Sequence, residues 1–445
     1  MPRVLFVAYA YPPVGGVGVQ RVLKWTKFLP EFGWQCSVLT VANPSVPIVD
    51  ESLARQIPEG TTIVTARTRE PSYQTKLAAA GPSESPSPLA RAKSLVKRPA
   101  IAAARRLLQP DPQILWYRDA VRVGRQFLTE QPHDCIVATA PPFSSLLLGR
   151  TLARHSELPL VVDYRDEWDL SNRHWENKKP GPIALEVQRR MQDAALKSAD
   201  LILSTSPGSA GELRRRADQA GASAPSEFIY NGYDPDDFPA VDPNAQREDF
   251  GHGTDRFRLT FAGTLWALNT IAPLADAVDK LDSAIRSRLE LVLVGRRLDD
   301  EEARVDRIEQ AGVAVSRVGF VEHSRALRMM QQSDALLAQT VPAEGTERVI
   351  SAKTFEYLAA GRPVLLVAKP GDQCELIERD PRSRTVDPER PDEIAAALGD
   401  LIAAGATDEL APPADLHRRE GARQLADRLA TLVAAPAESA TPAGV

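Results

Sequence analysis

The stretch ERVISAKTFEYLAAGRPVLL at residues 347–366 predicts a loop, a short helix, a sharp stop and a buried strand. Gly361 fits the left-handed position that ends a helix, and Pro363 cannot continue one. The apolar residues 335–338 predict the preceding strand. A strand, a loop and a helix in this order direct free helix N–H groups to one edge of a sheet, where they favour an anion such as phosphate. Because Glu356 lies inside the helix, where a carboxylate suits paired sugar hydroxyls, the stretch predicts a nucleotide-sugar site.

The same stretch resembles the donor-site helix of the group 1 glycosyltransferase family, which has the GT-B fold and retains the anomeric configuration. The spacing from Lys353 to Glu356 and the run EYLAAGRPV match the form found in bacterial polysaccharide enzymes. The resemblance covers nearly the whole chain and implies that Glu356 holds the ribose hydroxyls of the donor. A second family glutamate lies eight positions earlier, where this sequence has Arg348, and Glu347 beside it is a candidate donor-sugar contact. A solvated glutamate paired with Lys353 is the alternative interpretation of Glu356.

Composition limits the class of protein. A chain of 445 residues exceeds one core of typical size and predicts two domains. Its net charge of −5 argues against nucleic acid as the main partner. Cys36, Cys135 and Cys374 have neither disulfide nor metal-site spacing, and no signal-like or 18-residue apolar stretch occurs. We therefore expect a cytoplasmic protein that is not integral to a membrane.

Strand and helix patterns alternate along the chain, which is typical of parallel α/β architecture. Strands are predicted at residues 4–8, 37–40, 135–138, 160–163, 201–204, 258–262, 289–294, 314–318, 335–338 and 364–367. We expect two Rossmann-like domains, residues 1–235 and 254–414, facing each other across a cleft, and the resemblance implies the same GT-B architecture. Residues 234–253 are the expected linker. The helix at 415–433 is expected to pack back on the first domain, and residues 434–445 to be disordered.

Gly15 and Gly16 belong to a glycine-rich loop after the first predicted strand. Glycine lets the backbone approach a ligand closely, and the next helix presents its positive end. A dinucleotide-binding fingerprint has a tighter GxGxxG turn and an acid after the second strand, so their absence here counts against NAD. The resemblance implies that this loop approaches the donor phosphates, with Arg21 and Lys24 following on the helix. A purely structural turn is the alternative.

The sequence DYRDEW at residues 163–168 follows another predicted strand and resembles a signature of the polysaccharide branch of the family. Arg165 falls near the position where many members place a histidine close to the reacting sugar. Arg165 could stabilise charge or hold an acceptor, and Asp166 could orient an acceptor hydroxyl. The competing interpretation is an Arg–Asp pair that braces the loop, with Trp168 as its packing anchor.

Gly263 and Thr264 end the first strand of the second half, where the resemblance places the donor diphosphate. Many family members continue with an arginine and a lysine, but no Lys or Arg occurs between Arg258 and Lys280. Other cations must then stabilise the leaving diphosphate. The candidates, in order, are Lys353, Arg296 and Arg348. For Arg296, a surface cation at a strand end is the alternative.

The loop GFVEHS at residues 319–324 resembles the family's loop around the nucleotide base, which makes Val321 a candidate base contact. His323 is expected to belong to that loop rather than to act as a catalytic base. The six histidines show no metal-binding spacing, and no GxSxG elbow supports a hydrolase. We therefore expect neither a metal ion nor another cofactor besides the nucleotide-sugar co-substrate.

Basic residues concentrate between residues 91 and 108, with apolar residues interleaved and no acid between Glu84 and Asp111. A basic amphipathic helix of this kind can dock on an anionic membrane surface. Peripheral contact with the cytosolic membrane face is therefore one hypothesis for this segment, and a solvated helix of the first domain is the other.

These features and the resemblance together predict a glycosyltransferase that moves a hexose from a nucleotide-diphosphate sugar to a glycan or lipid-linked acceptor in polysaccharide or cell-envelope biosynthesis. The resemblance implies that the transfer retains the anomeric configuration and needs no metal ion. The candidate catalytic residues are Arg165, Asp166 and Lys353. The candidate donor-binding residues are Gly15, Gly16, Gly263, Thr264, Arg296, Val321, Glu347, Arg348 and Glu356. The alternatives are a nucleotide-sugar 2-epimerase of the same fold and a non-catalytic relative that acts as a binding or scaffold subunit. Turnover separates the scaffold from both enzymes, and product analysis separates transfer from epimerisation.

Overall fold

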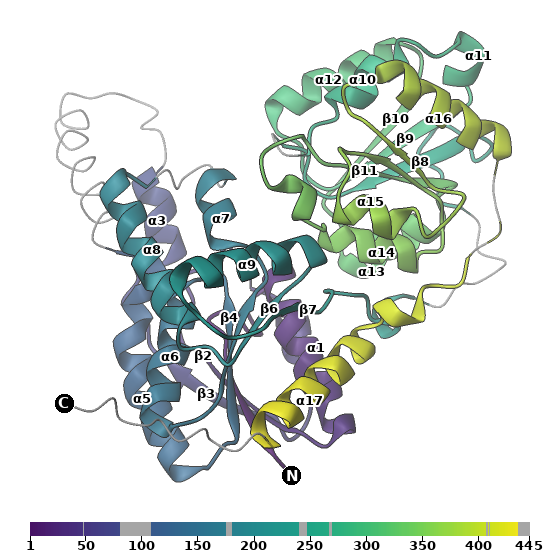
Figure 1. Ribbon diagram of the computed structural model, residues 1–445. Coiled ribbons are helices and arrows are strands. Elements are labelled where there is room, and N and C mark those ends of the chain that lie inside the picture. Colours follow the sequence, from purple (N-terminus) through teal and green to yellow (C-terminus); the bar gives the residue numbers. More distant parts are fainter. Residues whose placement is uncertain are drawn as a thin grey trace. The chain divides into compact units, whose positions relative to one another are not determined.

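The computed structural model describes residues 1–47, 49–80, 108–174, 180–239, 247–266, 269–405, 408 and 410–434. It contains two compact units, each built on a parallel sheet (Figure 1). Unit 1 comprises Met1–Tyr230 and Arg418–Val445, and unit 2 comprises Asn231–His417. The basic segment 91–108 and the tail 434–445 lie outside the described residues, apart from residues 108 and 434.

The sheet of unit 1 has, among the described residues, seven parallel strands in the order β3-β2-β1-β4-β5-β6-β7. They are β1 (Arg3–Val7), β2 (Gln35–Val41), β3 (Thr62–Ala66), β4 (Cys135–Ala140), β5 (Leu160–Tyr164), β6 (Leu201–Ser204) and β7 (Ser226–Phe228). The strand order reverses between β1 and its neighbour β4. Loops diverge at such a reversal, which makes the carboxyl edge of the sheet there the natural position for a ligand.

Helices cover both faces of this sheet. They are α1 (Gln20–Phe28), α2 (Glu51–Ala54), α3 (Tyr73–Ala80), α5 (Tyr117–Glu130), α6 (Ser144–Ser156), α7 (Trp168–His174), α8 (Pro182–Leu196), α9 (Pro207–Ala220) and α17 (Arg418–Ala434), with the 3-10 turns η1 (Val17–Val19), η2 (Leu29–Phe32) and η3 (Pro112–Trp116). Leu5 and Val7 of β1 belong to the core shared with α5 and α6. Val4 and Phe6 belong to the core shared with α1 and α17. The central strands are apolar on both faces because both faces are buried.

Unit 2 repeats this arrangement, with six described parallel strands in the order β10-β9-β8-β11-β12-β13. They are β8 (Phe257–Ala262), β9 (Leu289–Val294), β10 (Ala314–Gly319), β11 (Ala335–Gln339), β12 (Val364–Val367) and β13 (Arg384–Val386). The order reverses between β8 and β11, so the second ligand edge is expected at the ends of these two strands.

The helices of unit 2 also lie on both sides of their sheet (Figure 1). They are α10 (Ala272–Val278), α11 (Ser283–Arg286), α12 (Asp299–Gln310), α13 (His323–Gln331), α14 (Ala352–Ala359), α15 (Asp372–Ile377) and α16 (Pro391–Ala404), with the 3-10 turns η4 (Pro235–Asp237), η5 (Thr346–Arg348) and η6 (Ala414–Leu416). Helices α10, α12 and α16 share one core with β8 and β9. Helices α13, α14 and α15 lie on the opposite face, where Phe355 and Tyr357 of α14 are completely buried.

The two-unit α/β prediction is confirmed, and each predicted strand matches an observed one to within about two residues. Gly361 has φ of 69° just past α14, as predicted. Strands β3, β7 and β13 were not predicted. All three lie at sheet edges, where fewer side chains are buried: Ile63 of β3 is 40% exposed, and β7 and β13 have only three residues each. Short edge strands lack the continuous apolar run that marks a buried strand.

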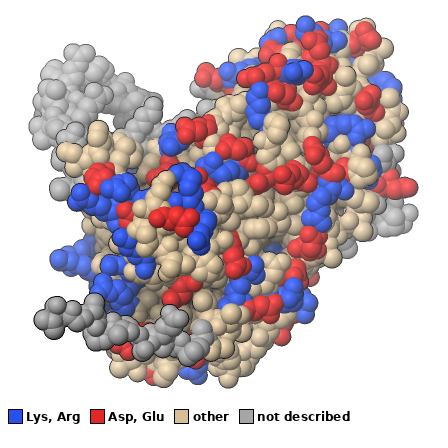
Figure 2. Space-filling view, viewed as in Figure 1, with Lys and Arg blue, Asp and Glu red and all other residues tan. Residues whose placement is uncertain are grey.

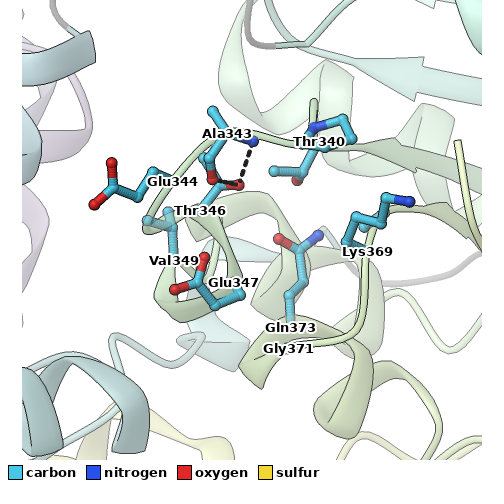
Figure 3. Close-up of a pocket in the computed structure, with 11 residues that line it drawn as sticks. Thr340, Ala343, Glu344, Thr346, Glu347, Val349, Lys369, Gly371 and Gln373 are labelled. Atoms are coloured by element: carbon cyan, nitrogen blue, oxygen red, sulfur yellow. Dashed lines mark hydrogen bonds between the residues drawn. The ribbon is translucent and has the colours of Figure 1, made fainter.

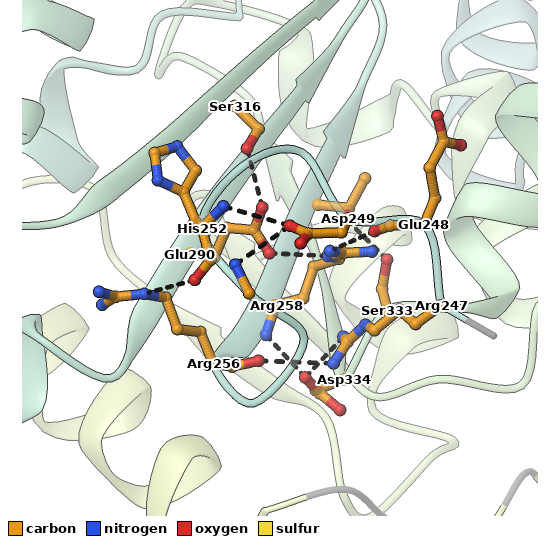
Figure 4. A network of polar contacts seen from close by, with 12 residues as sticks. Arg247, Glu248, Asp249, His252, Arg256, Arg258, Glu290, Ser316, Ser333 and Asp334 are labelled. Atoms are coloured by element: carbon orange, nitrogen blue, oxygen red, sulfur yellow. Dashed lines mark hydrogen bonds and ion pairs between the residues drawn. The ribbon is translucent and has the colours of Figure 1, made fainter.

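A network of charges closes the amino-terminal edge of the unit 2 sheet (Figure 4). Arg258 and Glu290 form an ion pair at 2.9 Å, and their side chains are 2% and 1% exposed. Asp334 accepts a hydrogen bond from the backbone N–H of Arg258 at 2.6 Å and another from Arg247 at 2.7 Å. Arg247, which belongs to the expected linker, is therefore hydrogen-bonded to this edge of the sheet.

Charges on the outer surface are mixed in sign. Figure 2 shows Lys and Arg interspersed with Asp and Glu over the face in view. On unit 2, Arg307 pairs with Asp276 and Asp279, and all three are largely exposed. Exposed pairs of this kind contribute little to stability, in contrast to the buried pair of Arg258 and Glu290.

Candidate functional site

In unit 1, the glycine-rich loop lies against the loop that follows β5. A Cβ atom placed on Gly18 would lie 3.2 Å from Nη1 of Arg165. Gly16 is exposed and has φ of 94°, a conformation that glycine adopts without strain. The structure thus brings the loop of Gly15 and Gly16 together with Arg165 at the carboxyl edge of the sheet.

Arg165 is held in place by backbone carbonyl groups. Its Nε donates a hydrogen bond to the carbonyl oxygen of Ala140 at 3.3 Å, and its Nη2 donates to that of Pro141. Burial lowers the pKa of Arg165 and the nearby Asp166 and Asp163 oppose this shift, but an arginine remains charged at neutral pH. Among the described residues, no carboxylate forms an ion pair with Arg165, so its charge stays available to a ligand.

Arg21, by contrast, makes its contacts in the interior of unit 1. Its Nη2 pairs with Asp163 at 2.9 Å, and its Nη1 donates to the carbonyl oxygen of Ile229 at 2.8 Å. Thr139 donates a further hydrogen bond to Asp163 at 2.7 Å. Lys24, one helical turn after Arg21, is also buried, at 2% exposure. Both cations that follow the glycine loop therefore lie inside unit 1.

Trp168 acts as the packing anchor of the DYRDEW motif. Its ring stacks on Phe143 at 4.5 Å between ring centroids, and its Nε1 donates to Oε1 of Gln188 at 3.0 Å. The motif therefore divides into two parts. Asp163 and Trp168 stabilise the fold, whereas Arg165 and the half-buried Asp166 lie at the edge of the sheet.

In unit 2, the loops after β8, β9 and β10 are packed backbone against backbone. The N–H of Gly263 donates to Val294 at 2.7 Å, and the N–H of Gly295 donates to Gly319 at 2.6 Å. A Cβ on Gly295 would lie only 2.1 Å from the carbonyl oxygen of Gly263. The φ values of Gly263 and Gly295 are 143° and 119°, so both positions require glycine.

Lys353 in the first turn of α14 reaches over Gly263. A Cβ on Gly263 would lie 1.9 Å from Nζ of Lys353, so any side chain there would displace the lysine. The ammonium group lies 4.7 Å from the centroid of the Phe261 ring, a cation–π contact. Burial lowers the pKa of Lys353 to about 8, and Glu356 opposes this shift. No carboxylate of the described residues forms an ion pair with this ammonium group.

Helix α14 is anchored to the sheet and presents Glu356 at its surface. The hydroxyl oxygen of Tyr357 accepts a hydrogen bond from the backbone N–H of Ala262 at 2.9 Å. Oε1 of Glu356 lies 3.0 Å from Nε2 of His323, the first residue of α13. The structure thus brings Glu356, Lys353 and the loop after β10 together at one edge.

The remaining candidate residues of unit 2 are more dispersed. Thr264 and Arg296 are exposed at the ends of β8 and β9. Val321 is half-buried, next to Phe320, whose side chain is 76% exposed. Glu347 pairs with the adjacent Arg348 at 2.7 Å.

Glu347 lines a pocket of about 330 Å³ between residues 340–349 and 368–373 (Figure 3). Gln373 lines this pocket and also the narrow cavity that contains Lys353. Sequence reasoning missed Gln373, because a lone glutamine in the first turn of a helix matches no motif. It also missed Phe320 as a separate candidate, although that aromatic residue lies two positions after the predicted strand 314–318.

No group of three His, Cys, Asp or Glu side chains is arranged to hold a metal ion in the described part of the chain. Within the same residues, no helix combines the length and the apolar character needed to cross a bilayer.

Two family models match the chain: a glycosyl transferase 4-like domain at residues 15–232, and a glycosyl transferases group 1 domain at residues 256–404. No curated protein sequence matches significantly. Solved structures show the same fold at low identity. Anabaena Alr3699/HepE in complex with UDP is 17% identical, with 97% of each chain covered and a TM-score of 0.55.

Two more solved structures are informative. WaaG, a glycosyltransferase involved in lipopolysaccharide biosynthesis, is 16% identical, with 97% of each chain covered and a TM-score of 0.52. A putative UDP-N-acetylglucosamine 2-epimerase from Listeria monocytogenes is 11% identical, with 95% of this chain and 94% of that chain covered and a TM-score of 0.51. Together the two domain models account for most of the chain, which carries glycosyltransferase domains arranged as in the GT-B fold of the solved structures.

Proposed function

We propose that the protein transfers a hexose, with retention, from a nucleotide-diphosphate sugar to a glycan or lipid-linked acceptor in polysaccharide or cell-envelope biosynthesis. The observation that carries the proposal is the position of Lys353. Its side chain is half-buried and desolvated enough to lower its pKa, it lies at the strand-order reversal of unit 2, and no described carboxylate pairs with it. A partly desolvated charge is costly unless an ion of opposite sign is bound. No described side chain caps the first turn of α14, whose N–H groups also suit an anion, so a diphosphate is the ligand that fits best.

The nucleoside would bind beside the diphosphate. Glu356 would accept hydrogen bonds from the ribose hydroxyls, with His323 fixing the orientation of its carboxylate through the 3.0 Å contact. Val321 and the exposed ring of Phe320 would contact the base. Supporting this assignment, the structure of the similar protein HepE contains UDP.

The transfer step follows from these positions. The acceptor hydroxyl oxygen bonds to the anomeric carbon while the bond from that carbon to the diphosphate oxygen breaks. The hydroxyl proton passes to the leaving diphosphate, whose charge Lys353 stabilises in place of a metal ion. Arg165 and Asp166 in unit 1 would hold the acceptor. A cytoplasmic location, with peripheral membrane contact through residues 91–108, completes the proposal.

A second candidate function is 2-epimerisation of the same donor, because a putative UDP-N-acetylglucosamine 2-epimerase shares the fold. It would use the same nucleotide site but requires acid–base groups around one sugar carbon. Analysis of the products formed from a nucleotide sugar, with and without an acceptor, distinguishes epimerisation from transfer. A protein that binds the donor but forms no product with any acceptor would be a binding subunit.

The first experiment measures the thermal stability of the protein with UDP, GDP, ADP and their common sugar conjugates, with and without EDTA. A ligand at 100 times its Kd adds about 2.7 kcal/mol, a shift of several degrees. We expect one nucleotide to give this shift in EDTA, and Glu356→Gln to weaken it while Glu309→Gln on α12 does not. If a folded sample shows no shift with any nucleotide, the proposal is wrong.

A further inference from the structure

We infer that the outer side of α8, with the groove that it forms beside α5 and α6, binds the same surface of a second copy of this chain. The protein would then form a dimer with two-fold symmetry through unit 1. The inference goes beyond the proposed function, because it uses no residue of the candidate nucleotide-sugar site.

The groove has a volume of about 380 Å³ and lies in unit 1, where η3, α5, α6 and α8 meet (Figure 1). Its apolar lining comes from all four elements: Ile114, Tyr117, Leu147, Val187, Met191 and Ala194. A hydrogen bond of 2.5 Å between the hydroxyl groups of Tyr117 and Thr151 fixes the Tyr117 ring against α6. An apolar groove on the surface favours an apolar side chain over water as its occupant.

Ile183, in the first turn of α8, is the apolar side chain that lacks a covering partner. It is 84% exposed, more than any other large apolar residue of the described chain. At 3.6 residues per turn, Ile183 lies on the same side of the helix as Val187, Met191 and Ala194, which line the groove. The residues of α8 that pack into unit 1 lie on another side: Gln188, Gln192, Ala195 and Leu196. Helix α8 therefore has a second, apolar side that points outward.

A groove and an exposed apolar side chain on one surface are complementary to each other. In a dimer with a two-fold axis, residue i of one copy contacts residue j of the other and j contacts i, so each contact is made twice. If two α8 helices pack antiparallel, Ile183 of each copy enters the groove of the other beside the partner's Met191. Val187 lies halfway between these two positions in the helix, so its two copies face each other at the axis.

The charges beside the groove favour a second copy over an anionic membrane. Arg190, which lines the groove, pairs with Glu186 at 2.8 Å. Glu186 also pairs with Arg189 at 2.8 Å, and Arg189 lies 3.3 Å from Asp193. With Arg150 on α6, three cations thus lie beside two acids, whereas a helix that docks on anionic lipids has a polar face rich in basic residues. In the antiparallel arrangement, Glu186 of each copy lies near Arg190 of the other, as electrostatic complementarity requires.

Sedimentation velocity of the intact protein tests the inference. Because one helix face and one groove make a small interface, we expect a shift from monomer to dimer over about two decades of concentration in the micromolar range. Ile183→Glu places a carboxylate in the apolar groove and should weaken dimerisation at least about tenfold. The matched control is Leu185→Glu. Leu185 is 43% exposed on the same helix, but two residues rotate the side chain by about 200°, away from the groove, so dimerisation should be unchanged.

Disulfide formation tests the geometry of the dimer. Cys36, Cys135 and Cys374 are buried, so a single added cysteine reports on its own position. Val187→Cys should give a disulfide-linked dimer with oxidised glutathione, because the two copies of this residue face each other. Gln310→Cys, on the exposed end of α12, is the control and should stay monomeric on a denaturing gel.

Three outcomes would overturn the inference. The first is a wild-type protein that stays monomeric at every concentration. The second is a dimer that Ile183→Glu and Leu185→Glu weaken equally, or that Val187→Cys does not link. The third comes from flotation with vesicles of phosphatidylcholine and phosphatidylglycerol: if the monomer binds them and Ile183→Glu abolishes this binding, the surface contacts a membrane instead.

Discussion

The two edges of the unit 2 sheet differ in whether their charged side chains form ion pairs. At the amino-terminal edge, Arg258 and Glu290 are paired, buried and surrounded by further hydrogen bonds, including one from Ser316 to Glu290 at 2.8 Å (Figure 4). At the carboxyl edge, Lys353 is half-buried and forms no ion pair with a carboxylate of the described residues. Its ammonium group lies over the Phe261 ring, and Glu356 attracts it without forming an ion pair. Both edges belong to the same strands, so the difference is the one that the proposed binding site at the carboxyl edge requires.

Unit 1 shows the same division at a smaller scale. Arg21 is paired with Asp163 inside the unit, whereas Arg165 is held only by carbonyl oxygens at the edge, as far as the described residues show. A paired buried charge stabilises the fold, because removing one partner leaves the other uncompensated. A buried cation without an acidic partner reduces stability and gains its partner only when an anion binds. The two kinds of charge should therefore respond differently to mutation.

The largest expected effect is at the amino-terminal edge of the unit 2 sheet, where Arg258 and Glu290 form a buried pair. Glu290→Gln leaves Arg258 buried without a carboxylate and should lower the free energy of unfolding by about 3–5 kcal/mol, measured by urea denaturation. Nucleotide affinity of the folded protein should stay within twofold of wild type. The control is Glu393→Gln, whose pair with Arg390 is exposed, so its loss should hardly change the free energy of unfolding. Equal costs for the two variants would contradict the distinction between paired buried and exposed charges.

The next effect is a pH dependence of stability and of nucleotide binding. We expect it at the carboxyl edge of the unit 2 sheet, where Lys353 lies, and not at the amino-terminal edge. Lys353 has a pKa of about 8 in the folded protein, compared with its ordinary value of 10.5. The unfolded chain therefore binds this proton between about pH 8 and 10.5 when the folded protein does not, so the Lys353 contribution to stability should improve as pH rises through this window. Nucleotide-diphosphate binding needs the charged amine and should weaken above pH 8, by up to about tenfold per pH unit.

Isothermal titration between pH 7 and 10 measures this dependence. The control is Lys353→Met, whose affinity should be low and nearly flat over the same range. An affinity of the wild-type protein that stays constant to pH 10 would show that the Lys353 charge takes no part in binding.

The smallest effect concerns the base contact. Phe320→Ala should weaken nucleotide binding by about 1 kcal/mol, roughly fivefold, because an aromatic ring that stacks on a base is lost. Since Phe320 is 76% exposed, the free energy of unfolding should change by less than about 0.5 kcal/mol. Ile183→Ala, another strongly exposed apolar side chain, is the control and should leave nucleotide affinity unchanged. A Phe320 variant with wild-type affinity would place the base elsewhere.

The sequence was sufficient for the fold and for selecting some of the candidate residues that lie together at one sheet edge. Local apolar runs predict buried strands such as β9 and β12, and Gly361 and Pro363 indicate where α14 ends. Lys353 and Glu356 could be selected because one helix carries both. Whether a charge is paired, however, depends on residues far apart in sequence: Arg21 and Asp163 are separated by 142 positions. No local pattern could tell that Arg21 belongs to the interior and Arg165 to the edge.

Gln373 illustrates a second reason why the sequence alone could not predict the whole candidate site. It lines the pocket only because α15 packs beside η5 and two separate segments of the chain form the pocket walls. The close approach of Lys353 to Gly263 is likewise a tertiary contact between residues 90 positions apart. Periodicity and motifs report what a segment buries, but cavities and unpaired donors appear only when distant segments are assembled.

The most direct test is a paired measurement on Lys353→Met, with the exposed Lys280→Met as control. Its free energy of unfolding and its Kd for the nucleotide diphosphate that stabilises the wild-type protein are measured under the same conditions at pH 7. Loss of a charged contact to phosphate should weaken binding about ten- to hundredfold, while the stability should be equal to or higher than that of the wild-type protein. A variant that binds the nucleotide as tightly as wild type, or that loses 3–5 kcal/mol of stability as a broken buried pair would, would contradict the assignment of this edge to binding.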